Sequence, residues 1–180
     1  MIPCREIRKE PVHIERNTPL KVIESLAETP CKSHNCSKCC EFGTGTALES
    51  DIPNIAKQLG MSEKDTKAKF FEPITKFNTT HWRPQMLAKP YGPCVFLDKQ
   101  KGCTIHSVRP TGCKLSSWNQ HSEQLNEWFD TNYFVNANDN ESIRQWATRL
   151  QFNSATIPGA KLNELVPDKE KLRKILAHEL

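Results

Sequence analysis

The cysteines are the residues in this 180-residue chain whose type and spacing most clearly indicate chemistry. Seven of the eight fall into two groups, and only Cys4 stands apart. The first group has the pattern C-x4-C-x2-C-C, and the second, after a long interval at residues 41–93, has the pattern C-x8-C-x9-C. We predict that the seven grouped thiols are metal ligands: Cys31, Cys36, Cys39, Cys40, Cys94, Cys103 and Cys113.

The spacing of these thiols suits a metal site built from two distant segments. A C-x2-C turn lets two sulfurs converge on one ion, and zinc takes four such ligands in a tetrahedral array. A hairpin entered at Cys94 and left at Cys103 would supply a second pair. The adjacent Cys39 and Cys40 do not readily share one ion, because neighbouring side chains of an extended chain point to opposite faces. Two interpretations stay open. The cysteines could bind two metals with a bridging thiolate, or they could bind one metal and leave the other thiols reactive.

Composition and charge narrow the cellular setting and the partners. No apolar run reaches the length of a signal peptide or a membrane span, so we expect a cytoplasmic protein that does not bind membranes. Thiols stay reduced in the cytoplasm, which favours metal ligands or redox groups over structural disulfides. The net charge is +4 without any block of like charges, so no nucleic-acid partner is expected. The expected partner is therefore a protein or a small molecule, of unknown kind.

Charged and imidazole side chains near the cysteines are candidates to support the site. Four thiolates around a divalent ion leave a formal charge of about −2, which nearby cations could neutralise. Arg109 is the strongest candidate, since it precedes Pro110 within the second cysteine group. His34 and His106 could each supply a nitrogen ligand, although the thiols suffice for one site. The cations close to a cysteine are Lys32, Lys38, Lys101, Arg109 and Lys114.

The pattern of apolar residues predicts a mainly α-helical fold. Over residues 48–60, for example, Leu48, Ile52, Ile55 and Leu59 share one helical face, and Gly60 is a stop signal. Ser62 and Asp65 have capping spacing at the start of the following helix, which we expect Pro73 to end. We expect Phe70 and Phe71 to pack in the core. Helices are predicted over residues 18–28, 48–60, 62–73, 140–151 and 167–180.

A short β-hairpin is expected between the last three cysteines. Its β-type runs lie around 95–97 and 104–105, joined by the turn "DKQKG". The predicted fold class is therefore mainly α with a short β-hairpin, in a small irregular single domain, 1–180, organised by metal. Residues 31–115 would form the metal-binding core, with a helical extension, 116–180, packed on it.

The two cysteine blocks resemble the YkgJ-type cysteine-cluster family, described as a zinc- or iron-chelating domain. That family shows C-x2-C-x2-C-C, then a C-x-F-L stretch, a second Cys, an I-Y or I-H pair, an R-P dipeptide and a final Cys. The resemblance covers about residues 31–115. The matching residues are Cys36, Cys39 and Cys40, then Cys94, Phe96, Leu97, Cys103, Ile105, His106, Arg109, Pro110 and Cys113.

The resemblance implies chelation of a metal or an iron–sulfur cluster, and it has one departure. The first cysteine of the family falls on Ser33, while Cys31 lies two residues earlier. A related cysteine block accompanies flagellin lysine methylation in some bacterial enzymes, so an enzymatic role stays open.

Three functions are therefore carried forward. The first is a metal-binding protein that holds a zinc or iron ion. The alternative is an iron–sulfur enzyme or redox protein, related to methyltransferases or oxidoreductases, because four cysteines suffice for a [4Fe–4S] cluster. The third function is a thiol catalyst without metal. It ranks last because the C-x2-C motif lies outside a thioredoxin-like βαβ pattern. No nucleotide-binding motif is present, so we expect no nucleotide cofactor.

Overall fold

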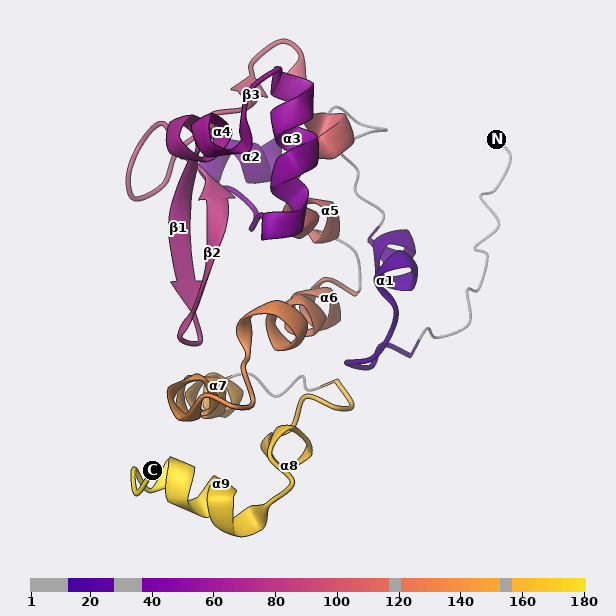
Figure 1. The fold of residues 1–180 in the computed structure, drawn as a ribbon. Helices are drawn as coiled ribbons and strands as arrows, with labels where there is room; N and C mark the ends of the chain where they lie inside the picture. Colours follow the sequence, from indigo (N-terminus) through magenta and orange to yellow (C-terminus); the bar gives the residue numbers. More distant parts are fainter. Residues whose placement is uncertain (1–12, 28–36, 117–120, 153–156) are drawn as a thin grey trace, which may run out of the picture.

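The computed structural model describes residues 13–27, 37–116, 121–152 and 157–180 (Figure 1). The fold class is as predicted, a small single domain that is mainly α-helical with short antiparallel hairpins. Two of the predicted ligands, Cys31 and Cys36, lie outside the described residues, as do His34 and Lys32.

The elements follow one another from the first described helix to the last. The helices are α1 Leu20–Leu26, α2 Lys38–Phe42, α3 Ile52–Leu59, α4 Glu63–Phe70, α5 Thr111–Leu115, α6 Ser122–Phe129, α7 Asn140–Phe152, α8 Leu162–Leu165 and α9 Lys169–Leu176. Short 3₁₀ turns lie at Glu49–Asp51 (η1) and His106–Val108 (η2), and a π-helical turn at Asp130–Phe134 (η3). The strands are β1 Phe71–Lys76, β2 Thr79–Pro84, β3 Leu97–Asp98 and β4 Gly102–Cys103.

Helices α3 and α4 begin and end on the residues that the sequence indicated. Gly60 follows α3 in the left-handed conformation, with φ of 65°, and its N–H returns to the carbonyls of Ala56 and Lys57. The Ser62 hydroxyl caps α4 by accepting the N–H of Asp65 at 3.1 Å.

The predicted helix over residues 62–73 is too long, because a β-hairpin begins at Phe71. Helix α4 ends at Phe70, and β1 pairs antiparallel with β2. Pro73 lies within strand β1 and does not end the helix; an edge strand tolerates the missing N–H of proline. The turn places Phe77 and Asn78 at φ of 49° and 57°. The missed hairpin runs from α4 toward α7 in Figure 1.

The hairpin predicted between the cysteines is present, but its strands are shorter and displaced. Strand β3 pairs with β4 over two residues each, and Cys103 lies inside the second strand. Asp98 fixes the turn, because its carboxylate accepts the N–H groups of Gln100 at 2.8 Å and Lys101 at 2.7 Å. These contacts hold the pKa of Asp98 below its usual range. Gly102 completes the turn with φ of 76°.

Two clusters of buried apolar side chains stabilise the described chain. The first joins α1 and the tip of the β1–β2 hairpin to the C-terminal helices; there Phe77 packs edge-on against Trp146 with ring centroids 5.1 Å apart. The second surrounds the cysteines, where Phe70 and Phe71 lie 5.2 and 5.9 Å from the ring of Phe96, as expected of core residues. Its buried members are Ala47, Ile52, Ile55, Phe71, Cys94, Phe96 and Ile105.

Helices α7, α8 and α9 lie at the end of the molecule away from α2 and β3 (Figure 1). Ile143 and Trp146 of α7 and Ile175 of α9 are completely buried, and Arg144 donates to the carbonyl of Ile175 at 2.8 Å. Helix α7 thus confirms the helix predicted at 140–151, and α9 confirms the one predicted at 167–180 but is shorter, Lys169–Leu176. Within the described ranges, no helix combines the length and apolar character needed to cross a membrane.

Candidate metal centre

Five thiols from four separate segments line one cavity of about 970 Å³. Two come from α2, one from the segment that enters the β3–β4 hairpin, one from β4 and one from α5. Cys94 is buried, Cys39 is exposed and the other three are intermediate. The fold therefore gathers every predicted ligand that it describes at one place: Cys39, Cys40, Cys94, Cys103 and Cys113.

The adjacent pair Cys39 and Cys40 lies on a helix, which removes the objection to adjacent ligands. Successive side chains on an α-helix are about 100° apart, whereas on a strand they point to opposite faces. Both side chains line the cavity, with their sulfurs 3.9 Å apart. The carbonyl of Cys40 also accepts the N–H of Cys94 at 2.7 Å, which joins α2 to the second cysteine group.

Backbone N–H groups point at three of the sulfurs. Cys94 accepts a hydrogen bond from the N–H of Phe96, and Cys103 accepts one from Ile105, two residues later in each case. Cys113 accepts from the N–H of Gly45 in a distant segment. An N–H donor at sulfur stabilises the thiolate, which is the form that binds a metal. The backbone therefore prepares these three sulfurs for a cation.

Burial has the opposite effect on the same thiols. It raises the pKa of Cys94 to about 11 and also raises the pKa of Cys103 and of Cys113. The pKa of Cys40 is raised too, first by its hydrogen bond with Cys39 and then by burial. Without a cation these four thiols keep their protons at neutral pH, and a bound metal ion would take the place of those protons.

Arg109 is the predicted cation that the structure places against a thiol. Its positive charge lowers the pKa of Cys103 and so opposes burial. Its Nη1 lies 2.8 Å from Nε2 of His106, and because a guanidinium only donates, that imidazole nitrogen accepts. The lone pair of this nitrogen is thereby used, so Nε2 of His106 is not a ligand in this arrangement. Lys101 lines the cavity, whereas Lys114 pairs with Glu24 at 3.5 Å.

Two glycines let the segment after α2 approach α5 closely enough to reach Cys113. A Cβ on Gly45 would lie 2.7 Å from the sulfur of Cys113, and one on Gly112 would lie 2.5 Å from the N atom of Thr46. The N–H of Gly112 donates to the carbonyl of Thr46 at 2.8 Å across this contact. No side chain larger than hydrogen fits between these two backbones.

Replacing Gly112 with alanine is expected to lower the free energy of unfolding by about 1–3 kcal/mol, because the new methyl group forces the two backbones apart. The same displacement moves Cys113 and should weaken metal binding. Urea denaturation and a metal competition assay measure the two effects. Gly43→Ala is the matched control in the same segment, since its Cβ would approach no closer than 4.0 Å to any neighbour. Equal free energies of unfolding and equal metal affinities in the two variants would contradict the argument that the backbones at Gly112 and Thr46 approach too closely for a side chain.

The donor set fits a thiophilic metal, although the described side chains alone do not close around one ion. Across residues 13–27, 37–116, 121–152 and 157–180, no three His, Cys, Asp or Glu side chains are grouped so as to hold a metal. All-sulfur donors with N–H groups aimed at them are nevertheless the ligands that zinc and iron take in cysteine sites.

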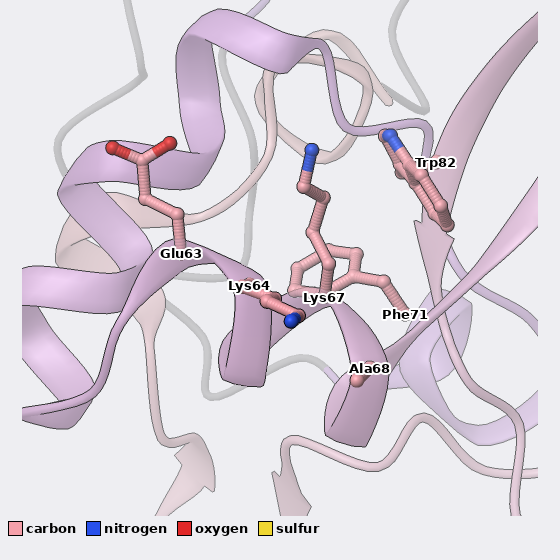
Figure 2. A pocket seen from close by; sticks show the side chains of 6 residues that line it. All are labelled: Glu63, Lys64, Lys67, Ala68, Phe71 and Trp82. Carbon is pink, nitrogen blue, oxygen red and sulfur yellow. The ribbon is translucent and has the colours of Figure 1, made fainter.

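A second hollow, of about 470 Å³, lies away from the cysteines beside α4 (Figure 2). Figure 2 shows Lys67 extending toward the indole of Trp82, with Phe71 at the base. Glu49 accepts from both polar groups, Lys67 at 2.9 Å and the indole N–H at 2.6 Å. These contacts satisfy the polar atoms and join η1 to β2, so the hollow has a structural explanation.

Sequence reasoning did not find the residues that position Cys113. Gly45 and Gly112 lie in short stretches typical of turns, "FGTGT" and "RPTGC", but which glycine faces another backbone depends on tertiary contact. Asp51 was likewise missed, although its carboxylate binds Thr111, 60 residues further along the chain. The only sequence signal was its place at the start of the helix after the first cysteine group.

No curated protein and no solved structure matches this chain. A family model, in contrast, matches residues 30–140, which include every grouped cysteine and the whole cavity lining. Its signature C-x2-C-x2-C-C agrees with the sequence at Cys36, Cys39 and Cys40 and departs from it at Ser33. With five thiols on one cavity and a family model over more than half its length, the chain belongs to the CxxCxxCC family, described as "Putative zinc- or iron-chelating domain".

Proposed function

We propose that this protein binds a zinc or iron ion through its two cysteine groups. The observation that carries the proposal is the convergence of five cysteines on one cavity from four segments between residues 39 and 113. Cysteines rarely gather in this way without a shared ligand, because each buried thiol gains little from its neighbours as a thiol. A cation that replaces their protons turns this cluster into a source of stability.

The described ligands divide into two sets with different support. Cys94, Cys103 and Cys113 accept backbone N–H groups, which favours the thiolate and fixes the direction of each sulfur. Cys39 and Cys40 come from α2, a five-residue helix with no buried residue. We propose that these two thiols bind the metal together with Cys31 and Cys36.

An iron–sulfur cluster is the second candidate, and the size of the cavity favours it. A single ion held at sulfur distances of about 2.3 Å needs little space beyond its ligands. The cavity of about 970 Å³ leaves room for a larger centre. The sulfurs of Cys39 and Cys40, 3.9 Å apart, instead suit one ion, whose tetrahedral thiolates lie about 3.8 Å from each other. A cluster would open a redox or methyl-transfer role.

Anaerobic purification followed by metal analysis and a visible spectrum distinguishes these candidates. We expect metal in a fixed ratio to protein. Colourless protein with stoichiometric zinc supports the ion, whereas brown protein with iron and acid-labile sulfide supports the cluster. Protein that retains neither metal, and gains none when Zn²⁺ or Fe²⁺ is added under reducing conditions, contradicts both.

A further inference from the structure

We infer that Asp51 is the positioning residue for the ligand Cys113, and that it acts through Thr111 at the start of α5. The inference rests on the metal-binding function proposed above and adds to it a residue outside both cysteine groups. Asp51 touches no sulfur; its effect is on where the sulfur of Cys113 lies.

The carboxylate of Asp51 binds the first residue of α5 with both oxygens. Oδ2 accepts the N–H of Thr111 at 2.9 Å, and Oδ1 accepts its hydroxyl at 2.7 Å. Oδ2 also accepts the N–H of Leu48 at 2.9 Å. One side chain therefore ties the η1–α3 segment to the start of α5, and Figure 1 shows α5 beside the lower end of α3.

This contact fixes α5 at the end that carries the thiol. Thr111 is 4% exposed, and the N–H of Gly112 next to it donates to Thr46. The two N–H groups before Cys113 are thus both held by the segment 46–51. Cys113 itself accepts the N–H of Gly45, the residue directly before that segment. A helix of five residues has little stability of its own, so these contacts set its position.

The geometry of the carboxylate, more than its charge, carries this role. An asparagine at position 51 can keep the bonds from both N–H groups with its amide oxygen. Its amide nitrogen can then donate to the hydroxyl of Thr111, which is able to accept. An alanine loses all three contacts. The variants Asp51→Asn and Asp51→Ala therefore separate a positioning role from an electrostatic one.

The test measures Co²⁺ affinity and the visible spectrum of the Co²⁺-loaded protein for wild type, D51A, D51N and T111V. We expect D51A to weaken Co²⁺ binding by about ten- to hundredfold, which is the usual cost of losing an orienting partner of a ligand. Its sulfur-to-cobalt charge-transfer band should also lose intensity, because one thiolate is displaced. D51N should stay close to wild type, and T111V, which loses only the hydroxyl contact, should lie between.

Asp168→Ala is the matched control for stability. Asp168 caps α9 by accepting the N–H of Lys171 at 2.9 Å, at the end of the molecule away from the thiols. The Asp168→Ala substitution should leave both the Co²⁺ affinity and the spectrum of the Co²⁺-loaded protein unchanged. Wild-type behaviour of D51A would overturn the inference, and so would an equal loss of Co²⁺ affinity in D51A and D168A.

A metal-independent measurement separates this inference from the proposed function. Alkylation of metal-free protein by iodoacetamide, followed site by site with mass spectrometry, reports how well Cys113 is held in place. We expect faster alkylation of Cys113 in D51A than in wild type or D51N. If wild type binds no metal, the proposed function fails while this rate still decides the role of Asp51. An unchanged rate of Cys113 alkylation in D51A would overturn the positioning role of Asp51.

Discussion

Replacing Cys113 with serine is expected to lower metal affinity by about a hundredfold or more. The free energy of a structural zinc site is about 10–16 kcal/mol over four ligands, so one thiolate accounts for about 3 kcal/mol. The metal-free fold should change little. Serine is close to cysteine in size, and its oxygen can accept the N–H of Gly45 that now points at the sulfur. The Cys113→Ser variant should therefore lose metal affinity while the stability of its metal-free fold stays close to that of wild type.

Competition between the protein and a chromophoric chelator for zinc measures the affinity, and urea denaturation of metal-free protein measures the stability. Cys4→Ser is the matched control, because it removes the one thiol that stands outside both cysteine groups. Equal metal affinity of the Cys113→Ser and Cys4→Ser variants would exclude Cys113 from the ligands. A large loss of metal-free stability would show that its role is in packing.

The approach of Cys94 and Cys103 to one cavity was predictable because both cysteines lie in a repeated local pattern. C-x-F and C-x-I each place an N–H two residues after a thiol, and such local geometry follows from short spacing alone. The helical face of α3 and the caps at Ser62 and Gly60 were predictable for the same reason, since each depends on residues within one or two turns.

The missed features all depend on contacts distant in sequence or on unusual backbone. The β1–β2 hairpin turns on Phe77 and Asn78, which lack the Asn-Gly or Asp-Gly signal of such turns. The buried ring of Phe77 against Trp146 compensates for that conformation, and no local pattern indicates this pairing. The contact between Gly45 and Cys113 likewise joins segments far apart in the chain.

The predicted division at residue 115 stays a prediction, but the apolar clusters describe the arrangement more closely. The C-terminal helices share one cluster with α1, Leu48 and Phe77, so residues from before the second cysteine group belong to it. The other cluster lies directly beneath the thiols. Packing therefore separates a thiol-bearing region from a larger apolar region, and the two should respond differently to loss of metal.

Removal of the metal is expected to release α2 first, then the β3–β4 hairpin, while the C-terminal helices stay protected. Helix α2 buries no residue and is joined to the hairpin by the N–H of Cys94 bonded to Cys40. The sequence predicts that residues 31–45 and 90–115 unfold before the rest of the chain when metal is removed, because little apolar surface holds them. Phe96 and Ile105 are buried at 4% and 1% exposure, however, so apolar contacts hold the second segment longer.

Hydrogen exchange with and without a chelator measures this order along the chain. For metal at a thousand times its Kd, binding protects the coupled amides by up to about a thousandfold, and the chelator should remove that protection. The loss should be largest at residues 38–43, smaller at 94–105 and absent at 140–152, where Ile143 and Trp146 are fully buried. Cys113→Ser protein is the control, because a hundredfold loss of affinity at the same metal concentration should leave only about tenfold protection. Uniform loss of protection across both apolar clusters would mean that the metal stabilises the whole fold, and no loss at residues 38–43 would mean that α2 carries no ligand.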